Sequence, residues 1–246
     1  MSQRSFNIVI PARYDSTRLP AKALCDIAGK TLIQRVYERA CESDADQVLV
    51  AADDQRIIDC CHDFGAKVLL TSTEHPSGTD RLAEVAQREQ WSDDQIVVNL
   101  QGDEPLMPAA LINQVANNLA LDSQAAIATF CKEFETLADF QNPNCVKVVF
   151  NQQQHALYFS RAPVPYDRDE ESSHPAHHHL GLYAYRAGYL EKFAQSASTR
   201  LEQLEKLEQL RALELGEKIH VDVTDLDVGI GVDTEADLEQ VRRLFQ

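Results

Sequence analysis

Short apolar runs alternate with amphipathic stretches through the first half of the chain, and this alternation constrains the fold more than any other feature. The apolar runs have the length of strands and lie at residues 6–10, 47–52, 67–70 and 95–100. Helical patterns separate them at about 31–42, 54–64, 79–90 and 108–121. Largely apolar strands joined by helices are typical of βαβ units whose parallel sheet is buried on both faces.

The pattern changes after the apolar run 125–130. Two further strand patterns, at 145–150 and 155–160, flank a polar turn and predict an antiparallel hairpin. Residues 163–178 are rich in Pro, Asp, Glu and His, which predicts a mobile surface loop, and a strand pattern resumes at 180–186.

Helices are predicted near 187–195 and 201–215, a strand at 218–223, and a last helix from about residue 234. A chain of 246 residues is long enough for one sizeable α/β domain. We therefore expect a single domain spanning 1–246, with a mostly parallel central sheet, helices on both faces and a smaller β-rich insertion at about 140–186.

The composition is acidic, with a formal net charge of -16. This argues against a general nucleic-acid binder, because such proteins neutralise phosphates with extended basic surfaces. The N-terminus lacks the apolar core of a signal peptide, and no stretch approaches transmembrane length, so no membrane insertion is expected. The six cysteines form no C-x-x-C pair, which indicates reduced thiols in a cytoplasmic protein.

Positive charge gathers in the loop after the first strand, which carries Arg13, Arg18 and Lys22. Ligands of open α/β sheets bind beyond the carboxyl ends of the strands, where this loop lies. No glycine precedes Gly29, so the loop is neither a Rossmann nor a Walker A sequence. Phosphate recognition here would depend on the basic side chains and backbone amides. Charge alone supports a phosphate cradle and a solvated basic loop about equally.

Two acidic positions indicate a metal site. Asp103 and Glu104 follow the strand 95–100, and Asp233 precedes the last helix. Carboxylates at such positions suit magnesium, although each could instead cap a helix. If Asp103 and Asp233 converge, their repulsion would be about 4 kcal/mol at roughly 4 Å and an effective dielectric constant of about 20. A divalent cation between them would turn that repulsion into binding.

The segment 174–179 holds four histidines, but their spacing matches no standard zinc pattern. His179, Tyr183 and Tyr185 would share one face of an extended strand. They could line a site for a polyhydroxylated ligand or form an aromatic core face, and both interpretations stay open. Leucines spaced by three from 201 to 213 indicate core packing or a subunit face.

Several motifs together resemble the CTP:3-deoxy-manno-octulosonate cytidylyltransferase (CMP-Kdo synthetase) family, and the resemblance runs from about residue 6 to 245. In order, they are IPARYDSTRLPAKAL, HPSGTDRLAEV, VVNLQGDEP, NPNCVKVV, YFSRAPVPYDR, HLGLYAYR, LEQLRALELGEKIHV and GVDT. The resemblance implies a Rossmann-like nucleotidyltransferase fold and a homodimer. It also implies transfer of CMP from CTP to the anomeric hydroxyl of Kdo or its 8-amino analogue. Pyrophosphate would be released, and the activated sugar would serve lipopolysaccharide biosynthesis.

The resemblance also implies roles for individual residues. The triphosphate would be held by Arg13, Arg18 and Lys22. The neighbourhood of cytosine and ribose would comprise Ser77, Gly78, Arg81 and Gln101. The magnesium ligands would be Asp103 and Asp233, which with Arg13 and Lys22 form the catalytic set. Residues expected around the sugar acid are Arg161, His179, Tyr183, Glu208 and Gln209.

This chemistry agrees with the residues. Magnesium can neutralise a triphosphate, orient an in-line attack and lower the pKa of a bound hydroxyl, so no general base or covalent enzyme intermediate is required. A glycosyltransferase of related architecture is the alternative, but Gly102-Asp103-Glu104 lacks the D-x-D pattern usual in such enzymes. A non-catalytic ligand sensor is a third possibility, and it would be expected to have lost the basic loop or one acidic position.

Overall fold

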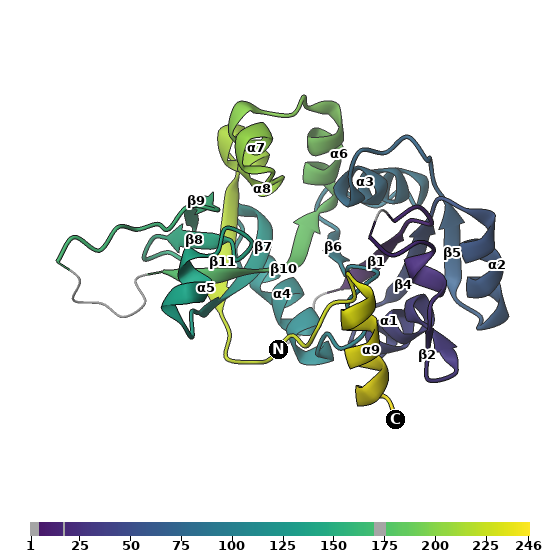
Figure 1. The fold of residues 1–246 in the computed structure, drawn as a ribbon. Coiled ribbons are helices and arrows are strands. Elements are labelled where there is room, and N and C mark those ends of the chain that lie inside the picture. The colour runs from purple at the N-terminus through teal and green to yellow at the C-terminus, as the bar shows by residue number, and fades with distance from the viewer. Residues whose placement is uncertain (1–4, 17, 170–175) are drawn as a thin grey trace.

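A nine-stranded mixed sheet runs through the computed structural model, which describes residues 5–16, 18–169 and 176–246 (Figure 1). Seven strands follow the order β11-β7-β10-β6-β1-β4-β5, and β8 and β9 branch from β10. The strands are β1 (Phe6–Ala12), β4 (Gln47–Ala52), β5 (Lys67–Leu70), β6 (Ile96–Asn99), β7 (Ala125–Glu133), β8 (Lys147–Phe150), β9 (Ala156–Ser160), β10 (His177–Arg186) and β11 (Lys218–Val223). A separate two-stranded sheet joins β2 (Asp26–Ile27) to β3 (Lys30–Thr31).

Helices cover both faces of the large sheet. One face packs against α1 (Leu32–Cys41), α2 (Gln55–Asp63), α4 (Ala109–Leu121) and α9 (Glu235–Leu244). The other packs against α3 (Gly78–Arg88), α6 (Ala187–Gln195), α7 (Arg200–Glu205) and α8 (Gln209–Glu214). The short α5 (Leu137–Gln141) and the 3₁₀ turn η1 (Lys22–Leu24) complete the helical segments.

Strand β1 shows why the sequence dictates two cores. Ile8 and Ile10 point into one core and Val9 into the other, and all three side chains are fully buried. Successive side chains of a strand face opposite sides, so a run that is apolar throughout must be covered twice. The strand accordingly lies inside the sheet, parallel to both β4 and β6.

Strand β10, in the middle of the sheet, runs in the opposite direction to its two neighbours. It is antiparallel to β6 and to β7, whereas β11 is parallel to β7. The pairing places Asn99, the last residue of β6, between Val9 of β1 and Tyr183 of β10. The carboxyl ends of β1 and β6 therefore lie beside the middle of β10. The loops that leave these strand ends and the side chains of β10 can then line the same site.

The predicted α/β class is confirmed, as is the antiparallel pairing of β8 with β9. Two predicted boundaries near the site differ most from the structure. The helix expected at 201–215 is divided, because Lys206 adopts a left-handed conformation with φ 55° that ends α7. Strand β10 begins at His177, inside the expected loop, where it gains pairing with both β7 and β8. The remainder of that loop includes 170–175, which lie outside the described residues.

None of the helices in the described part of the chain combines the length and the apolar composition that crossing a bilayer requires.

Candidate active site

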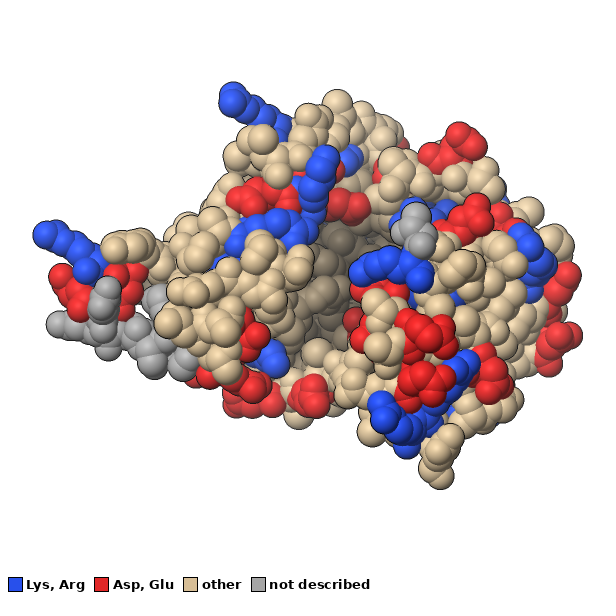
Figure 2. All heavy atoms as spheres, in the orientation of Figure 1, with Lys and Arg blue, Asp and Glu red and all other residues tan. Residues whose placement is uncertain are grey.

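A cleft of about 660 Å³ opens beyond the carboxyl ends of β1 and β6. Figure 2 shows a deep hollow in one face of the molecule, with basic side chains on its rims. Within the described residues, every predicted site residue except Arg161 and His179 lines this cleft. The loops after β1 and β6 supply Arg13, Lys22 and Asp103, and the β11–α9 connection supplies Asp233.

Asp103 and Asp233 converge on the ammonium group of Lys22. The Nζ atom lies 2.6 Å from Asp103 Oδ2 and 3.2 Å from Asp233 Oδ1. Arg18 donates a further hydrogen bond to Asp233 Oδ1 at 2.9 Å. The backbone joins the same two loops, because the Val232 amide donates to the Asp103 carbonyl at 2.8 Å. Two carboxylates 130 positions apart in sequence are thus held around one cation.

Neither aspartate caps a helix, so that alternative interpretation is wrong. The N-cap of α9 is Thr234, whose hydroxyl accepts from the Asp237 amide while Asp237 completes a capping box. Helix α4 follows Pro108 and has no side-chain cap. Both carboxylates can therefore serve a ligand.

The two loops approach each other closely. A Cβ atom on Gly102 would lie only 2.7 Å from the Pro11 carbonyl oxygen, so this position in the loop after β6 requires glycine. Next to it, Glu104 lies against Gly231 of the β11–α9 connection. Burial and the negative charges of Asp103 and Asp233 raise the pKa of Glu104 to about 7.

The segment Ser77–Arg81 forms the start of α3 and faces the cleft. The Ser77 hydroxyl caps the helix, accepting from the Asp80 amide at 3.2 Å and donating to Asp80 Oδ2 at 2.7 Å. Arg81 is only 1% exposed and donates to Asp53 Oδ2 at 3.2 Å and to the Thr71 hydroxyl. Burial lowers the pKa of Arg81. A helix N-terminus beside a basic loop is an arrangement suited to anions.

On the aromatic face of β10, some side chains line the cleft and another is packed in the interior. Tyr183 and Tyr185 reach the wall of the cleft. His179 lies behind them, with its ring 5.3 Å from that of Tyr183 and its Nε2 atom 3.2 Å from the Thr129 hydroxyl. Burial lowers the pKa of His179 to about 3, so the imidazole is neutral at physiological pH.

Glu208 and Gln209, at the start of α8, close the cleft opposite the basic loop. Glu208 accepts a hydrogen bond from the Thr79 hydroxyl at 2.9 Å, and burial raises its pKa. Arg161 instead supports the end of α7, because it donates to the carbonyls of Glu205 at 2.6 Å and Pro143 at 3.0 Å.

Sequence reasoning missed Asn99 and Thr79, which also line the cleft. Asn99 carried a signal that could have been used, since it is a polar residue that ends an otherwise apolar strand. Thr79 lies inside the motif SGTDR, but nothing in the sequence indicates that its partner is Glu208.

A cleft at the ends of parallel strands, with a cationic loop facing paired carboxylates, defines the class of nucleotide-binding α/β transferases. The chain belongs to the cytidylyltransferase family, because residues 7–219 match the family model described as Cytidylyltransferase. The resemblance inferred from the ordered motifs is thereby confirmed, and the protein is a nucleotidyltransferase.

Curated relatives agree with this assignment. The 3-deoxy-manno-octulosonate cytidylyltransferase of Hahella chejuensis is 53% identical, over 98% of each chain. That of Photobacterium profundum is 52% identical, over 98% of this chain and 99% of the relative.

Solved structures agree as well. The structure of CMP:2-keto-3-deoxy-manno-octonic acid synthetase complexed with CTP superposes with a TM-score of 0.91, at 43% identity and 98% coverage of both chains. A cytidylyltransferase from Leptospira borgpetersenii, at 16% identity and a TM-score of 0.63, shares the fold, covering 97% of this chain and 84% of its own. These comparisons favour the nucleotidyltransferase prediction over the glycosyltransferase alternative.

Proposed function

We propose that the protein transfers CMP from CTP to the anomeric hydroxyl of 3-deoxy-manno-octulosonate and releases pyrophosphate. The observation that carries this proposal is the convergence of Lys22, Asp103 and Asp233 in one cleft. Relatives at about half identity bear the name of this activity, and the superposed synthetase was solved with CTP.

The basic loop would hold the triphosphate. Arg13, Arg18 and Lys22 all line the cleft, and the start of α3 lies beside this loop, where Gly78 approaches Pro11. Arginine can donate two parallel hydrogen bonds to phosphate oxygens, and lysine contributes a compact charge. Ser77, Arg81 and Gln101 would then contact the nucleoside.

We further propose that Asp103 and Asp233 hold Mg²⁺. The donor set fits the ion, because magnesium takes one or two carboxylates and completes its shell with water and substrate phosphates. The pair already surrounds the ammonium of Lys22, which supports a preference for positive charge at this position. Bound magnesium would neutralise phosphate charge and lower the pKa of the attacking hydroxyl. Lys22 would then be free to pair with phosphate oxygens.

The sugar acid would occupy the side of the cleft formed by Tyr183, Glu208 and Gln209. Several hydrogen bonds to its hydroxyls would fix the anomeric oxygen in line with the α-phosphorus. His179 packs against Tyr183, and Arg161 holds the end of α7, so both would support this side of the cleft rather than touch the substrate. Kdo is the proposed sugar, its 8-amino analogue stays an alternative, and the cytoplasmic location stays a prediction.

Pyrophosphate release tests the proposal directly. The purified protein should be assayed with each of the four NTPs, magnesium, and either Kdo or 8-amino-Kdo. We expect release that requires CTP and one of the two sugars, and that stops when magnesium is chelated. An absence of release with CTP and either sugar would refute the proposed reaction.

Asp103→Asn and Asp233→Asn test the metal site. Each variant removes one carboxylate charge without changing volume, so turnover should fall on the order of a hundredfold or more while the fold persists. Asp63→Asn, at the exposed end of α2, is the matched control and should retain normal rates. Near-normal turnover of Asp103→Asn or Asp233→Asn at saturating magnesium would remove that residue from the metal site.

A further inference from the structure

Asn99 is a buried polar side chain of the cleft to which the proposed function gives no role. It ends β6 after three apolar residues, and only 2% of its surface is exposed. Its side chain lines the cleft, yet its Oδ1 atom has no hydrogen-bond partner. A buried acceptor without a donor is unfavourable, and nearly all such atoms in folded proteins are paired.

Asn99 lies among the tyrosines of β10. In the register of the sheet, Asn99 lies opposite Tyr183 of β10. Burial raises the pKa of the neighbouring Tyr185 phenol, while hydrogen bonds from Thr79 and Asn99 oppose that rise. The carbonyl oxygen of Asn99, which has no partner in the protein, is therefore available to accept a hydrogen bond from a group that fills the cleft.

A second unpaired atom on the same cleft belongs to Arg81, which would contact the nucleoside. Arg81 is 1% exposed, and its Nε donor also lacks a partner. A hydroxyl group can donate to an acceptor such as Asn99 Oδ1 and can also accept from a donor such as Arg81 Nε or a tyrosine. A ligand with several hydroxyl groups matches this set of partners better than an anion, which cannot donate.

We propose that Asn99 Oδ1 accepts a hydrogen bond from one hydroxyl of the sugar substrate and so selects for that hydroxyl. The inference rests on the proposed function. Asn99 faces the tyrosines of β10, whereas the basic loop and the aspartates lie beyond the strand ends. A site built to pair with a hydroxyl discriminates strongly against an analogue without it, because the protein atom is then left buried and unpaired.

The test compares wild-type enzyme with one substituted variant on a series of sugars, each of which lacks a single hydroxyl. Wild-type enzyme and Asn99→Ala are assayed for kcat/KM with CTP and each sugar. We expect the wild type to lose about tenfold or more on one analogue. Asn99→Ala should lose a similar factor on the full sugar and almost nothing further on that analogue, with KM for CTP changed less than about twofold.

Other outcomes overturn the inference. Equal losses of Asn99→Ala on every sugar, or a loss confined to CTP, would indicate a structural or a nucleotide-binding role. Asn99→Ser keeps a smaller acceptor, so it should recover part of the discrimination, and it replaces Asn99→Ala if that variant does not fold. A wild type insensitive to every missing hydroxyl also refutes the inference without any variant. If the wild type does not use CTP and the full sugar at all, the proposed function fails instead.

Discussion

Lys22 occupies the place between Asp103 and Asp233 that a metal would need. Its side chain is mostly shielded from solvent, so the attraction is stronger than that of a surface ion pair. Charge at this position is therefore locally balanced within the protein, although two carboxylates face each other. We expect Lys22→Ala to weaken CTP binding and also to leave those carboxylates uncompensated.

At the same scale, Asp122 joins three parts of the chain outside the active site. Its Oδ2 atom lies 2.8 Å from His155 Nε2 and 3.1 Å from His220 Nδ1. Burial alone would raise the pKa of Asp122, but hydrogen bonds from His155, the Gln124 amide and His220 outweigh it and lower the pKa to about 2. The ionised carboxylate is thus favoured by the folded state.

This shift predicts acid sensitivity. The folded pKa lies below the unfolded value, so the stabilisation is complete above pH 3.8 and is lost as pH falls toward about 2. Asp122→Asn should lower the free energy of unfolding at pH 6 by about 2 kcal/mol and make the loss between pH 5 and pH 2 shallower. Urea titrations across this range measure both effects. Asp94→Asn, whose side chain is 95% exposed, should follow the wild type. Parallel curves for Asp122→Asn and wild type would contradict the assignment.

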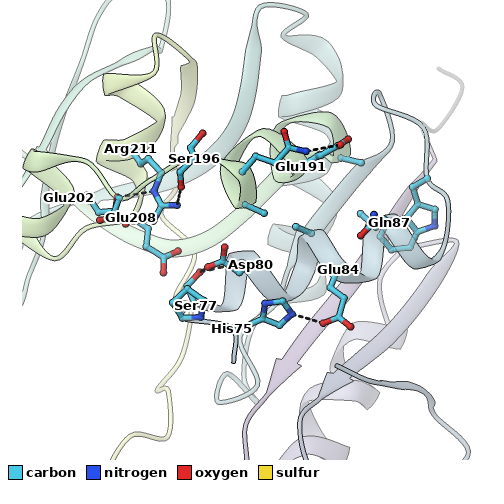
Figure 3. Close-up of a pocket in the computed structure, with 18 of the residues that line it drawn as sticks. His75, Ser77, Asp80, Glu84, Gln87, Glu191, Ser196, Glu202, Glu208 and Arg211 are labelled. Carbon is cyan, nitrogen blue, oxygen red and sulfur yellow. Dashed lines mark hydrogen bonds and ion pairs between the residues drawn. The ribbon is translucent and has the colours of Figure 1, made fainter. Parts of the chain in front are cut away.

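Among the elements, the loop between β5 and α3 is fastened to the helix that follows it. Glu84 of α3 accepts from the Ser72 amide at 2.9 Å and pairs with His75, and it also contacts Arg88. Figure 3 shows His75 turned toward Glu84, with Ser77 nearby at the start of the helix. Glu84 thus positions the loop that leads into Ser77.

Loosening this attachment should affect nucleotide binding. Glu84→Gln keeps the shape but weakens the contacts with His75 and Arg88, so KM for CTP should rise about threefold to tenfold with little change in kcat. Steady-state kinetics at saturating sugar measure the effect. Glu89→Gln makes the same change of charge at the end of α3, where Glu89 pairs with Lys67, and should leave KM unchanged. Equal effects of the two variants would show that only the charge of the helix matters.

The elements also show how far sequence reasoning reached. Strand β1 and the loop behind it could be predicted, because an apolar run followed by clustered basic residues is a local signal. The ends of α7 and β10 could not, because they depend on the left-handed Lys206 and on pairing with β7 and β8. Asp103 and Asp233 could be named as candidates, but their convergence on Lys22 is set by loops that no local pattern reveals.

For the molecule as a whole, we propose one domain over 1–246 with a β-rich insertion at about 140–186. Strand β10 supports this proposal, since it pairs with β6 through Tyr183–Arg186 and with β8 through His177 and His178. Apolar side chains remain uncovered on the outer elements. Leu157 of β9 is 62% exposed and Leu204 of α7 is 70% exposed.

We expect these exposed side chains to lie at the subunit interface of the predicted homodimer. Leu157→Asp would place a charge where a subunit interface requires apolar contact, so the variant should shift from dimer toward monomer. Sedimentation velocity at several concentrations measures the change. Leu244→Asp is the control, because Leu244 is similarly exposed, at 61%, on α9, which lies apart from β9 and α7 (Figure 1). A wild type that sediments as a monomer, or a control that dissociates equally, would contradict this surface.

The cleft has basic side chains on its rim, whereas the protein as a whole is acidic (Figure 2). This charge distribution favours small anions over long ones. A long polyanion such as RNA would meet the negative surface over much of its length, and a few arginines could not offset that repulsion. A nucleotide is small enough to fit within about one Debye length of the rim, roughly 10 Å at 0.1 M salt, so it experiences mainly the local positive field. The same charge distribution can therefore admit a free triphosphate while keeping cellular nucleic acids from occupying the cleft.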